Sequence, residues 1–204
     1  MNINTTYTKI ITGEDLMETA QHGSTLYPFQ FYYEDLSVFD FNCIEWHWHT
    51  ELEFIYIESG TVTLWIGEDQ FHLTEGNGIF INTKVLHRLY SPSKALIPNF
   101  VFMPSFIAPC DSLIYQKYIL PIISSSLPFL VFHKKVCWQA KVLSIMRQII
   151  SAQDSVLSKE LLTSSLLQNL WLEIFENTDI SYQEEHKDHS TASQARLQLM
   201  LQFI

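Results

Sequence analysis

The sequence predicts a mainly β chain in which a barrel or sandwich of short strands is followed by a layer of two helices. Apolar residues make up 47% of the 204 residues and charged residues 17%, which is typical of a folded globular chain. Between residues 24 and 106, short aromatic and β-branched runs alternate with turn signals. After Pro128 the apolar residues change to helical spacing. We therefore expect one β domain over residues 1–127, with strands spaced as in a sandwich or barrel.

The expected strands follow one another closely. Val62, Leu64 and Ile66 alternate with threonines and Trp65, so this strand turns one face to the core and the other to solvent or a cavity. Glycine-containing turns separate it from its neighbours. The strands are expected within TLYPFQFYY (25–33), VFDFNCIEWHWH (38–49), ELEFIYIESGTVTLWIGEDQFHL (51–73) and EGNGIFIN (75–82).

Residues 128–176 are expected to form two amphipathic helices, the second with Ser158 as its N-cap. Both apolar faces are wider than packing on one side of a small barrel requires. They predict either a dimer contact or a compact helical layer within one subunit, and the pattern does not separate the two. The residues assigned to the dimer helices are Trp138, Val142, Ile145, Ile149, Leu162, Leu166 and Leu170.

The last part of the chain changes character. Residues 177–193 are polar and charged, which is typical of a linker, and we expect His186 and His189 within it to be solvated. Residues 194–204 begin another amphipathic helix, and the sequence stops without a C-cap. We therefore expect the chain to be a fragment that ends just inside a second domain.

Charge and cysteine usage limit the class of protein. The 22 acidic and 12 basic residues give a net charge of −10, so this part of the protein is not expected to contact nucleic acid. The wide spacing of Cys43, Cys110 and Cys137 indicates reduced thiols. Because there is neither a signal peptide nor an apolar run long enough to cross a bilayer, we expect a cytoplasmic protein without a membrane partner.

A cluster of metal-binding residue types lies in HWHTELEF (47–54). His47 and His49 are two residues apart, so they project to the same side of a strand, and a bend would bring Glu53 to the same interior. His87 is the candidate for a fourth ligand from a neighbouring strand. Such ligands suit one divalent ion of Zn, Ni, Fe or Mn. The alternative is that these groups only hydrogen-bond the strands of an empty barrel.

These residues resemble the two motifs of the cupin superfamily, over about residues 24–106. His47, His49, Glu53 and Gly60 match the first motif, although Phe41 replaces its leading glycine. In the second motif Gly76 and His87 keep the spacing, whereas the Pro, Gly and Asn positions are occupied by Asn82, Lys84 and Ser91. The resemblance implies a cupin-like double-stranded β-helix (a jelly-roll barrel), with His47, His49, Glu53 and His87 as metal ligands.

The wider layout resembles an AraC/XylS-type transcription regulator. In that family an effector-binding barrel and helices precede a DNA-binding domain with two helix-turn-helix units. The resemblance implies a homodimer in which a small-molecule effector in the barrel controls DNA binding by a C-terminal domain, of which residues 194–204 would be the start. The alternative is a metal-dependent cupin enzyme such as a dioxygenase or isomerase, which the complete ligand set favours. The C-terminal third favours the regulator, so we expect no catalytic residues.

The effector pocket is expected in the barrel interior. Trp65 is expected to line it, because it lies on the face opposite to the aliphatic residues of its strand. Trp46 and Trp48 alternate with the histidines and should point away from it, beneath helices or at a subunit contact. His22 and His72 are expected to be ordinary polar residues.

Overall fold

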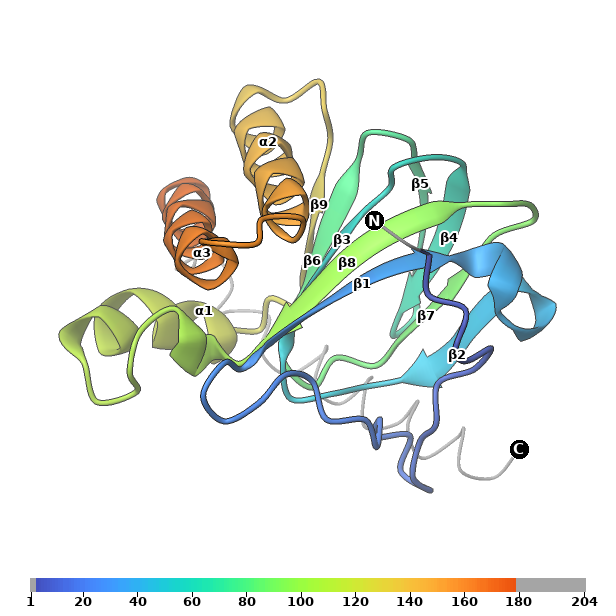
Figure 1. Ribbon diagram of the computed structural model, residues 1–204, viewed down its shortest axis with the longest axis horizontal. Helices are drawn as coiled ribbons and strands as arrows, with labels where there is room; N and C mark the ends of the chain where they lie inside the picture. The colour runs from blue at the N-terminus through green and yellow to red at the C-terminus, as the bar shows by residue number, and fades with distance from the viewer. Residues whose placement is uncertain (1–2, 179–204) are drawn as a thin grey trace.

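The computed structural model describes residues 3–178, whose strands form two antiparallel sheets (Figure 1). Within this range, one sheet has five strands in the order β1-β8-β3-β6-β9 and the other has four in the order β2-β7-β4-β5. The chain passes repeatedly from one sheet to the other, which confirms the cupin-like, mainly β fold class with C-terminal helices. The strands are β1 (Phe29–Asp35), β2 (Cys43–His47), β3 (Leu52–Tyr56), β4 (Thr61–Ile66), β5 (Asp69–Thr74), β6 (Gly78–Ile81), β7 (His87–Tyr90), β8 (Leu96–Phe102) and β9 (Phe129–Phe132).

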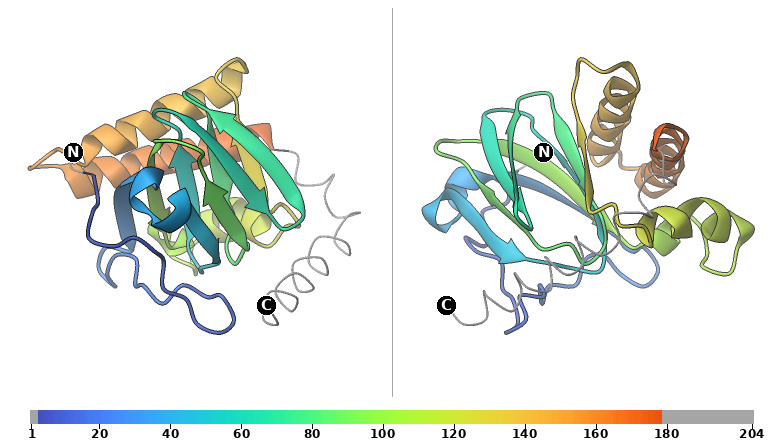
Figure 2. Two further views of the ribbon diagram at one scale, coloured as in Figure 1. Left: turned by 90° about the vertical axis from the view of Figure 1, so that its right-hand side faces the viewer. Right: turned by 180° about the vertical axis from the view of Figure 1, so that it is seen from behind.

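The two sheets face each other and enclose an aliphatic interior (Figure 2). Val62, Leu64 and Ile66 of β4 point into it, as the alternation predicts. Ile55 of β3 and Ile79 of β6 meet them from the five-stranded sheet. The barrel interior is therefore apolar except where polar residues are placed among these side chains.

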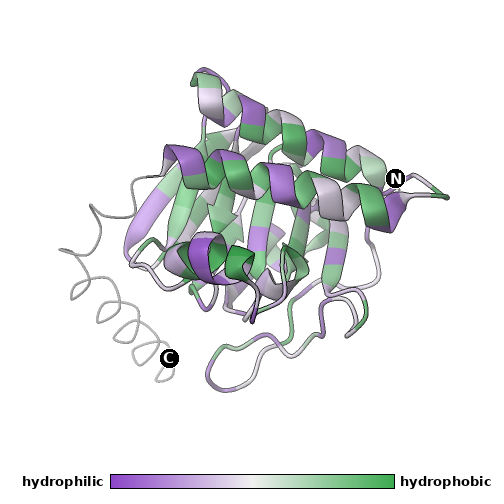
Figure 3. Cartoon of the chain, turned by 90° about the vertical axis from the view of Figure 1, so that its left-hand side faces the viewer, coloured by the Kyte–Doolittle hydropathy of each residue, from purple (hydrophilic) through white to green (hydrophobic). Residues whose placement is uncertain are grey.

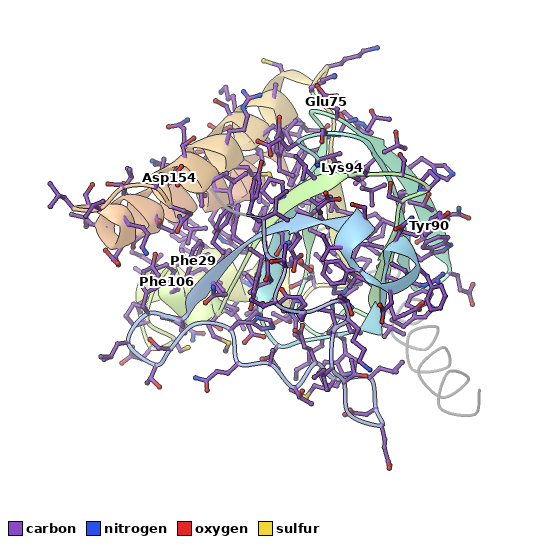
Figure 4. All side chains as sticks on the ribbon, turned by 45° about the vertical axis from the view of Figure 1, so that its right-hand side comes forward. Phe29, Glu75, Tyr90, Lys94, Phe106 and Asp154 are labelled. Atoms are coloured by element: carbon purple, nitrogen blue, oxygen red, sulfur yellow. The ribbon has the colours of Figure 1, made fainter. Side chains whose placement is uncertain are left out.

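The opposite face of the five-stranded sheet is covered by helices. These are α1 (Leu120–Ile123), α2 (Cys137–Ala152) and α3 (Lys159–Asn177), all on one side of the sheet (Figure 1). Phe54, Phe80, Phe100 and Phe132 are fully buried between sheet and helices. Because this sheet is buried on both faces, β3 reads as a continuous apolar run interrupted only by Glu53. Phe29 and Phe106 lie together in the same core, with ring centroids 6.1 Å apart (Figure 4).

The five-stranded sheet ends later in the sequence than predicted. β9 pairs with β6 through partners such as Ile79 and Val131, so the β domain continues past residue 127. A helical layer beginning at residue 128 is therefore wrong, and α2 begins at Cys137. The cause is the brevity of FLVF (129–132), because a four-residue apolar run fits a strand and a helical turn equally well.

The helical stripes lie inside the subunit. Val142, Ile149, Leu166 and Leu170 are buried, and Trp138 and Ile145 pack against the same core. The assignment of these six residues to a dimer contact is wrong, because their side chains cover the sheet and one another. Of the seven assigned residues, Leu162 alone is exposed, at 41%. Figure 3 views the helical layer from outside and shows hydrophilic and hydrophobic residues mixed along both helices.

Several smaller expectations have clear outcomes. Ser158 occupies the N-cap position of α3, but its hydroxyl contacts that of Ser155 instead of a helix amide. All three cysteines are unpaired. Among residues 3–178, no helix combines the length and apolar content needed to span a bilayer. The predicted linker covers residues 177–193, but Asn177 still belongs to α3. The rest of the linker from residue 179, with His186 and His189, and the predicted helix at 194–204 lie outside the described residues.

Gly60, in the turn between β3 and β4, has φ +88°, and a Cβ there would lie 2.7 Å from the carbonyl oxygen of Lys94 and 2.9 Å from Ala95. Gly67 also has positive φ, at +57°, but a Cβ there would meet nothing within 4 Å. We expect Gly60→Ala to lower the free energy of unfolding by about 3 kcal/mol and Gly67→Ala by about 1 kcal/mol, because only the first adds a backbone clash to the left-handed strain. Urea titration of both variants measures the difference, and equal losses would contradict the clash.

Candidate metal centre

A β-bulge at the end of β2 directs His47 into the barrel. Ile44 pairs with Leu89 and His47 pairs with His87, so three steps along β2 match two along β7. The extra residue reverses the alternation, and Ile44 and His47 therefore both face the interior. His47 and His87 are cross-strand partners, with ring centroids 4.1 Å apart. His49, two residues further along, is also buried.

Three imidazoles converge, and the backbone holds each ring in the same way. The Nδ1 atoms of His47, His49 and His87 lie 2.8, 3.2 and 2.9 Å from the carbonyl oxygens of Glu45, Glu51 and Val85. A carbonyl oxygen only accepts, so Nδ1 donates and Nε2 of the neutral ring keeps its lone pair. One ligand atom from each ring lies within 4.8 Å of the others. This anchoring is typical of metal-binding histidines.

Glu53, at the start of β3, faces two of these imidazoles. Its Oε2 atom lies 3.4 Å from Nε2 of His49 and 3.1 Å from Nε2 of His87. Nε2 of His87 is fully buried and makes no hydrogen bond. Two lone pairs directed at a carboxylate oxygen repel unless a proton or a metal ion lies between them. Ligand atoms of a tetrahedral metal 2.0–2.1 Å away lie about 3.4 Å apart, so these spacings fit a shared ion.

Burial and charge set the protonation states of this cluster. Burial, reinforced by the neighbouring His87 and His49, lowers the pKa of His47 well below its usual value. Burial alone would raise the pKa of Glu53, but the His49 and His87 imidazoles beside its carboxylate hold it well below its usual range. A neutral imidazole beside an ionised carboxylate is the combination that a divalent metal requires.

Three of the ligand candidates, His47, His49 and Glu53, line a small cavity of about 30 Å³. Its opposite wall is formed by the segment before β1, which contributes Tyr7, Glu18 and His22 and runs beside β2 (Figure 2). Strands β1 and β8 complete the wall with Glu34 and Asn99. This volume corresponds to one water molecule or one ion.

Comparison with known proteins identifies the family. The model of the AraC-like ligand binding domain matches residues 30–171. The chain belongs to this family. A curated relative, the uncharacterized HTH-type transcriptional regulator YdeC of Bacillus subtilis, is 23% identical over 199 residues. The alignment covers 95% of this chain and 66% of YdeC, so the chain spans somewhat less than two thirds of that relative.

Solved structures support the fold of this AraC-like ligand binding domain. A structure of ToxT from Vibrio cholerae at 1.65 Å resolution matches with a TM-score of 0.52 and 15% identity, over 76% of this chain and 58% of ToxT. A second ToxT structure, from strain O395, matches with a TM-score of 0.51 and 12% identity, over 74% and 56% of the two chains. At such identities the likeness shows a shared fold.

The cavity of this chain has polar lining residues that were not predicted from the sequence. His22, expected to be an ordinary polar residue, is 7% exposed, and its ring lies 5.6 Å from that of His49. Its Nδ1 lies 2.8 Å from the Tyr32 hydroxyl and its Nε2 3.3 Å from Glu18 Oε2. The segment around His22 has no strand periodicity, so no signal placed it at the barrel. His72 contacts the Thr63 hydroxyl on the exposed side of the sheet, as an ordinary polar residue would.

The tryptophans lie outside the cavity. The indole of Trp65 is on the outer face of β4, where the Arg88 guanidinium lies 5.1 Å from its ring centroid. Its prediction as a pocket residue is wrong, because the aliphatic residues of β4 face the cavity side. Trp48 points away from the interior as predicted, but the N-terminal segment covers it instead of helices. Its indole donates to the Asp15 carbonyl at 2.8 Å.

Glu34 is a buried acid in the cavity wall. Its carboxylate oxygens accept from the Tyr7 hydroxyl at 2.6 Å and from the Asn99 amide at 2.8 Å. Burial raises the pKa of Glu34 to about 7, although both hydrogen bonds act in the opposite direction. The sequence did contain a sign of this buried acid, because Glu34 is a charged residue within the aromatic run FQFYYED (29–35).

The raised pKa of Glu34 predicts a pH-dependent stability. Between its unfolded value of 4.5 and about 7, the folded chain binds more protons than the unfolded chain, so this group's contribution falls as pH rises through that window. The loss by pH 8 is about 3 kcal/mol. We expect Glu34→Gln to be more stable relative to wild type at pH 8 than at pH 5, measured by urea unfolding at both values. A difference that does not change with pH would contradict this.

Proposed function

We propose that this chain is the ligand-sensing part of an AraC-type transcription regulator, in which occupancy of the barrel cavity controls DNA binding by a further domain. The observation that carries the proposal is a small cavity with polar lining residues inside a domain of the AraC-like ligand binding family. The relative named as an HTH-type regulator supports it. The net charge of −10 fits a part of the protein that does not itself contact DNA.

Packing supplies a route from the cavity to the helices. In β3 and β8, alternate residues face the cavity and the helical layer: Val101 lines the cavity, whereas Phe100 and Phe102 pack in the core beneath α2 and α3. In the same way, Glu53 of β3 lines the cavity and its neighbour Phe54 packs in the core beneath the helices. A change at the cavity wall therefore shifts the sheet against α3, whose last residue, Asn177, is the first residue of the predicted linker.

The four clustered ligand candidates would hold one divalent transition metal. His47, His49 and His87 would provide nitrogen ligands and Glu53 an oxygen ligand, a set that suits Zn, Ni, Fe or Mn. When bound, such an ion supplies positive charge and Lewis acidity. The chain's own contribution is to hold the rings through Glu45, Glu51 and Val85 and to exclude solvent.

A metal-dependent cupin enzyme is the second candidate, because the same donor set favours it. The family match over residues 30–171 favours the sensor.

A thermal-shift screen of divalent metals and metabolite classes tests the proposal, because a ligand that binds only the folded chain raises its melting temperature. We expect at least one to do so and to be recovered unchanged. Chemical conversion of the stabilising molecule would support the enzyme, and a screen without any stabilising ligand would contradict ligand sensing.

We further propose that the chain forms a homodimer through the outward face of α3. Leu161 and Leu172 are 77% and 51% exposed, and α3 borders an apolar groove of about 510 Å³ together with residues 107–118. Apolar area of this kind on a helix is typical of a subunit contact. We expect sedimentation at micromolar concentration to give a dimer, and Leu172→Glu to give a monomer. Leu157→Glu, in the loop before α3, is the matched control; a monomeric wild type would contradict the proposal.

A further inference from the structure

The cavity has the charge character of a cation site. Its lining residues include three carboxylates, Glu18, Glu34 and Glu53, and no lysine or arginine. Carboxylates gathered in a low-dielectric enclosure attract cations and repel anions. Sugar phosphates and carboxylic acids are therefore poor candidates for the molecule that this barrel senses.

The size of the cavity also favours a cation over an organic ligand. Sites for organic ligands usually have volumes of about 300 Å³ or more, whereas this one is about 30 Å³. Aliphatic side chains from both sheets, including Ile44, Ile55 and Leu89, line its remaining sides. The space between these walls therefore suits an ion better than an organic molecule.

The segment at the end of β2 that carries two candidate ligands also pairs with the segment before β1. Between His47 and His49, the amide of Trp48 donates to the Leu16 carbonyl at 3.1 Å, and the Trp48 carbonyl accepts from the Glu18 amide at 2.9 Å. An ion that fixes the two imidazoles also fixes the backbone of Trp48. Occupancy of the site is thereby coupled to the attachment of the N-terminal segment.

We propose that a divalent first-row transition-metal ion is itself the signal that this barrel senses, and not a permanent cofactor beside an organic effector. The inference rests on the proposed function and names the ligand class of its site. The ion binds reversibly, and its binding strengthens the pairing of residues 16–18 with Trp48.

Titration of the chelator-stripped chain with Zn²⁺ and Ni²⁺ tests this, with hydrogen exchange of residues 16–18 and tryptophan fluorescence as readouts. We expect a saturable response at one ion per chain that EDTA reverses, with slower exchange in the N-terminal segment. His47→Ala should weaken binding by more than about 100-fold, whereas His72→Ala should bind as wild type does. Trp48→Phe should still bind metal but lose most of the fluorescence response. Binding of Co²⁺ to wild type, followed by its visible absorption, needs no variant and checks the site if His47→Ala does not fold.

Two results would overturn the inference. Metal binding without any change in exchange of residues 16–18 would make the ion a static cofactor. An organic molecule that slows this exchange while the metal content stays constant would make that molecule the signal, and would leave the proposed sensing function intact. If neither metals nor organic molecules stabilise the chain, the proposed function fails together with the inference.

Discussion

A saturating divalent metal is expected to raise the free energy of unfolding of the wild-type chain, and His87→Ala is expected to abolish that gain. At a free metal concentration 1,000 times the dissociation constant, the stabilisation is about 4 kcal/mol. His87 is fully buried, and its Nε2 atom lies 3.1 Å from Glu53 Oε2. Its removal deletes one of three converging nitrogen ligands and leaves an incomplete set. Urea unfolding with Zn²⁺ and with EDTA measures the increment.

Wild type and His87→Ala are compared by the stability that the metal adds, because the substitution also lowers the stability of the metal-free chain. Deleting a buried imidazole creates a cavity and removes the contact with Glu53, so both forms of the variant lose stability. His72→Ala is the matched control, since His72 lies on β5 with its ring against Thr63, away from the cavity. We expect the control to keep the whole increment. An undiminished increment in His87→Ala would show that the metal binds elsewhere.

Phe54→Ala is expected to lower the free energy of unfolding by about 3–5 kcal/mol. The Phe54 ring is fully buried between the five-stranded sheet and the helices, with centroids 5.0 Å from Phe80 and 5.3 Å from Phe100. Because aromatic rings surround it, the site has little freedom to collapse around an alanine. Urea denaturation followed by circular dichroism measures the loss.

Leu26→Ala provides the control for Phe54→Ala. Leu26 is also a large apolar residue but is 97% exposed, so its truncation should change the free energy of unfolding by less than about 0.5 kcal/mol. Comparable losses in the two variants would contradict a core between the sheet and the helices. Because Phe54 adjoins Glu53 in β3, we also expect its truncation to weaken metal-induced stabilisation.

Local spacing in the sequence was sufficient to predict the ligand cluster and the class of fold. His47 and His49 share one side of an extended segment, and the spacing to Glu53 and His87 keeps the two-motif pattern. The bulge in β2 did not affect this prediction, because it lies before His47 and only changes which earlier residue shares its face. Strand geometry therefore placed His47 and His49 together, and the resemblance to the two-motif pattern implied the full set with Glu53 and His87.

The face of a strand that meets the cavity could not be predicted in the same way. The alternation in β4 correctly placed Trp65 opposite to the aliphatic residues, but a period of two does not say which face is interior. The helical stripes pose the same problem, because a wide apolar face fits a double-layered core or a subunit contact. In both cases tertiary packing decided the outcome.

The opposite wall of the cavity depends on contacts distant in sequence. Tyr7 and Glu34 are 27 residues apart, and Asn99 reaches Glu34 across 65 residues. The segment that contributes Glu18 and His22 forms neither a helix nor a strand apart from isolated β-bridges, so its apolar residues have no regular period that would reveal its position. Its place beside the metal ligands follows from backbone pairing with Trp48, which only the three-dimensional structure reveals.

X-ray absorption spectroscopy of the zinc-loaded chain tests the central proposition most directly. The geometry predicts one zinc ion per chain with three imidazole nitrogens and one carboxylate oxygen in its coordination shell, and a changed shell in Glu53→Gln. A zinc environment with fewer than three imidazoles, or one unaltered by that substitution, would contradict an interior ion-binding site in this domain.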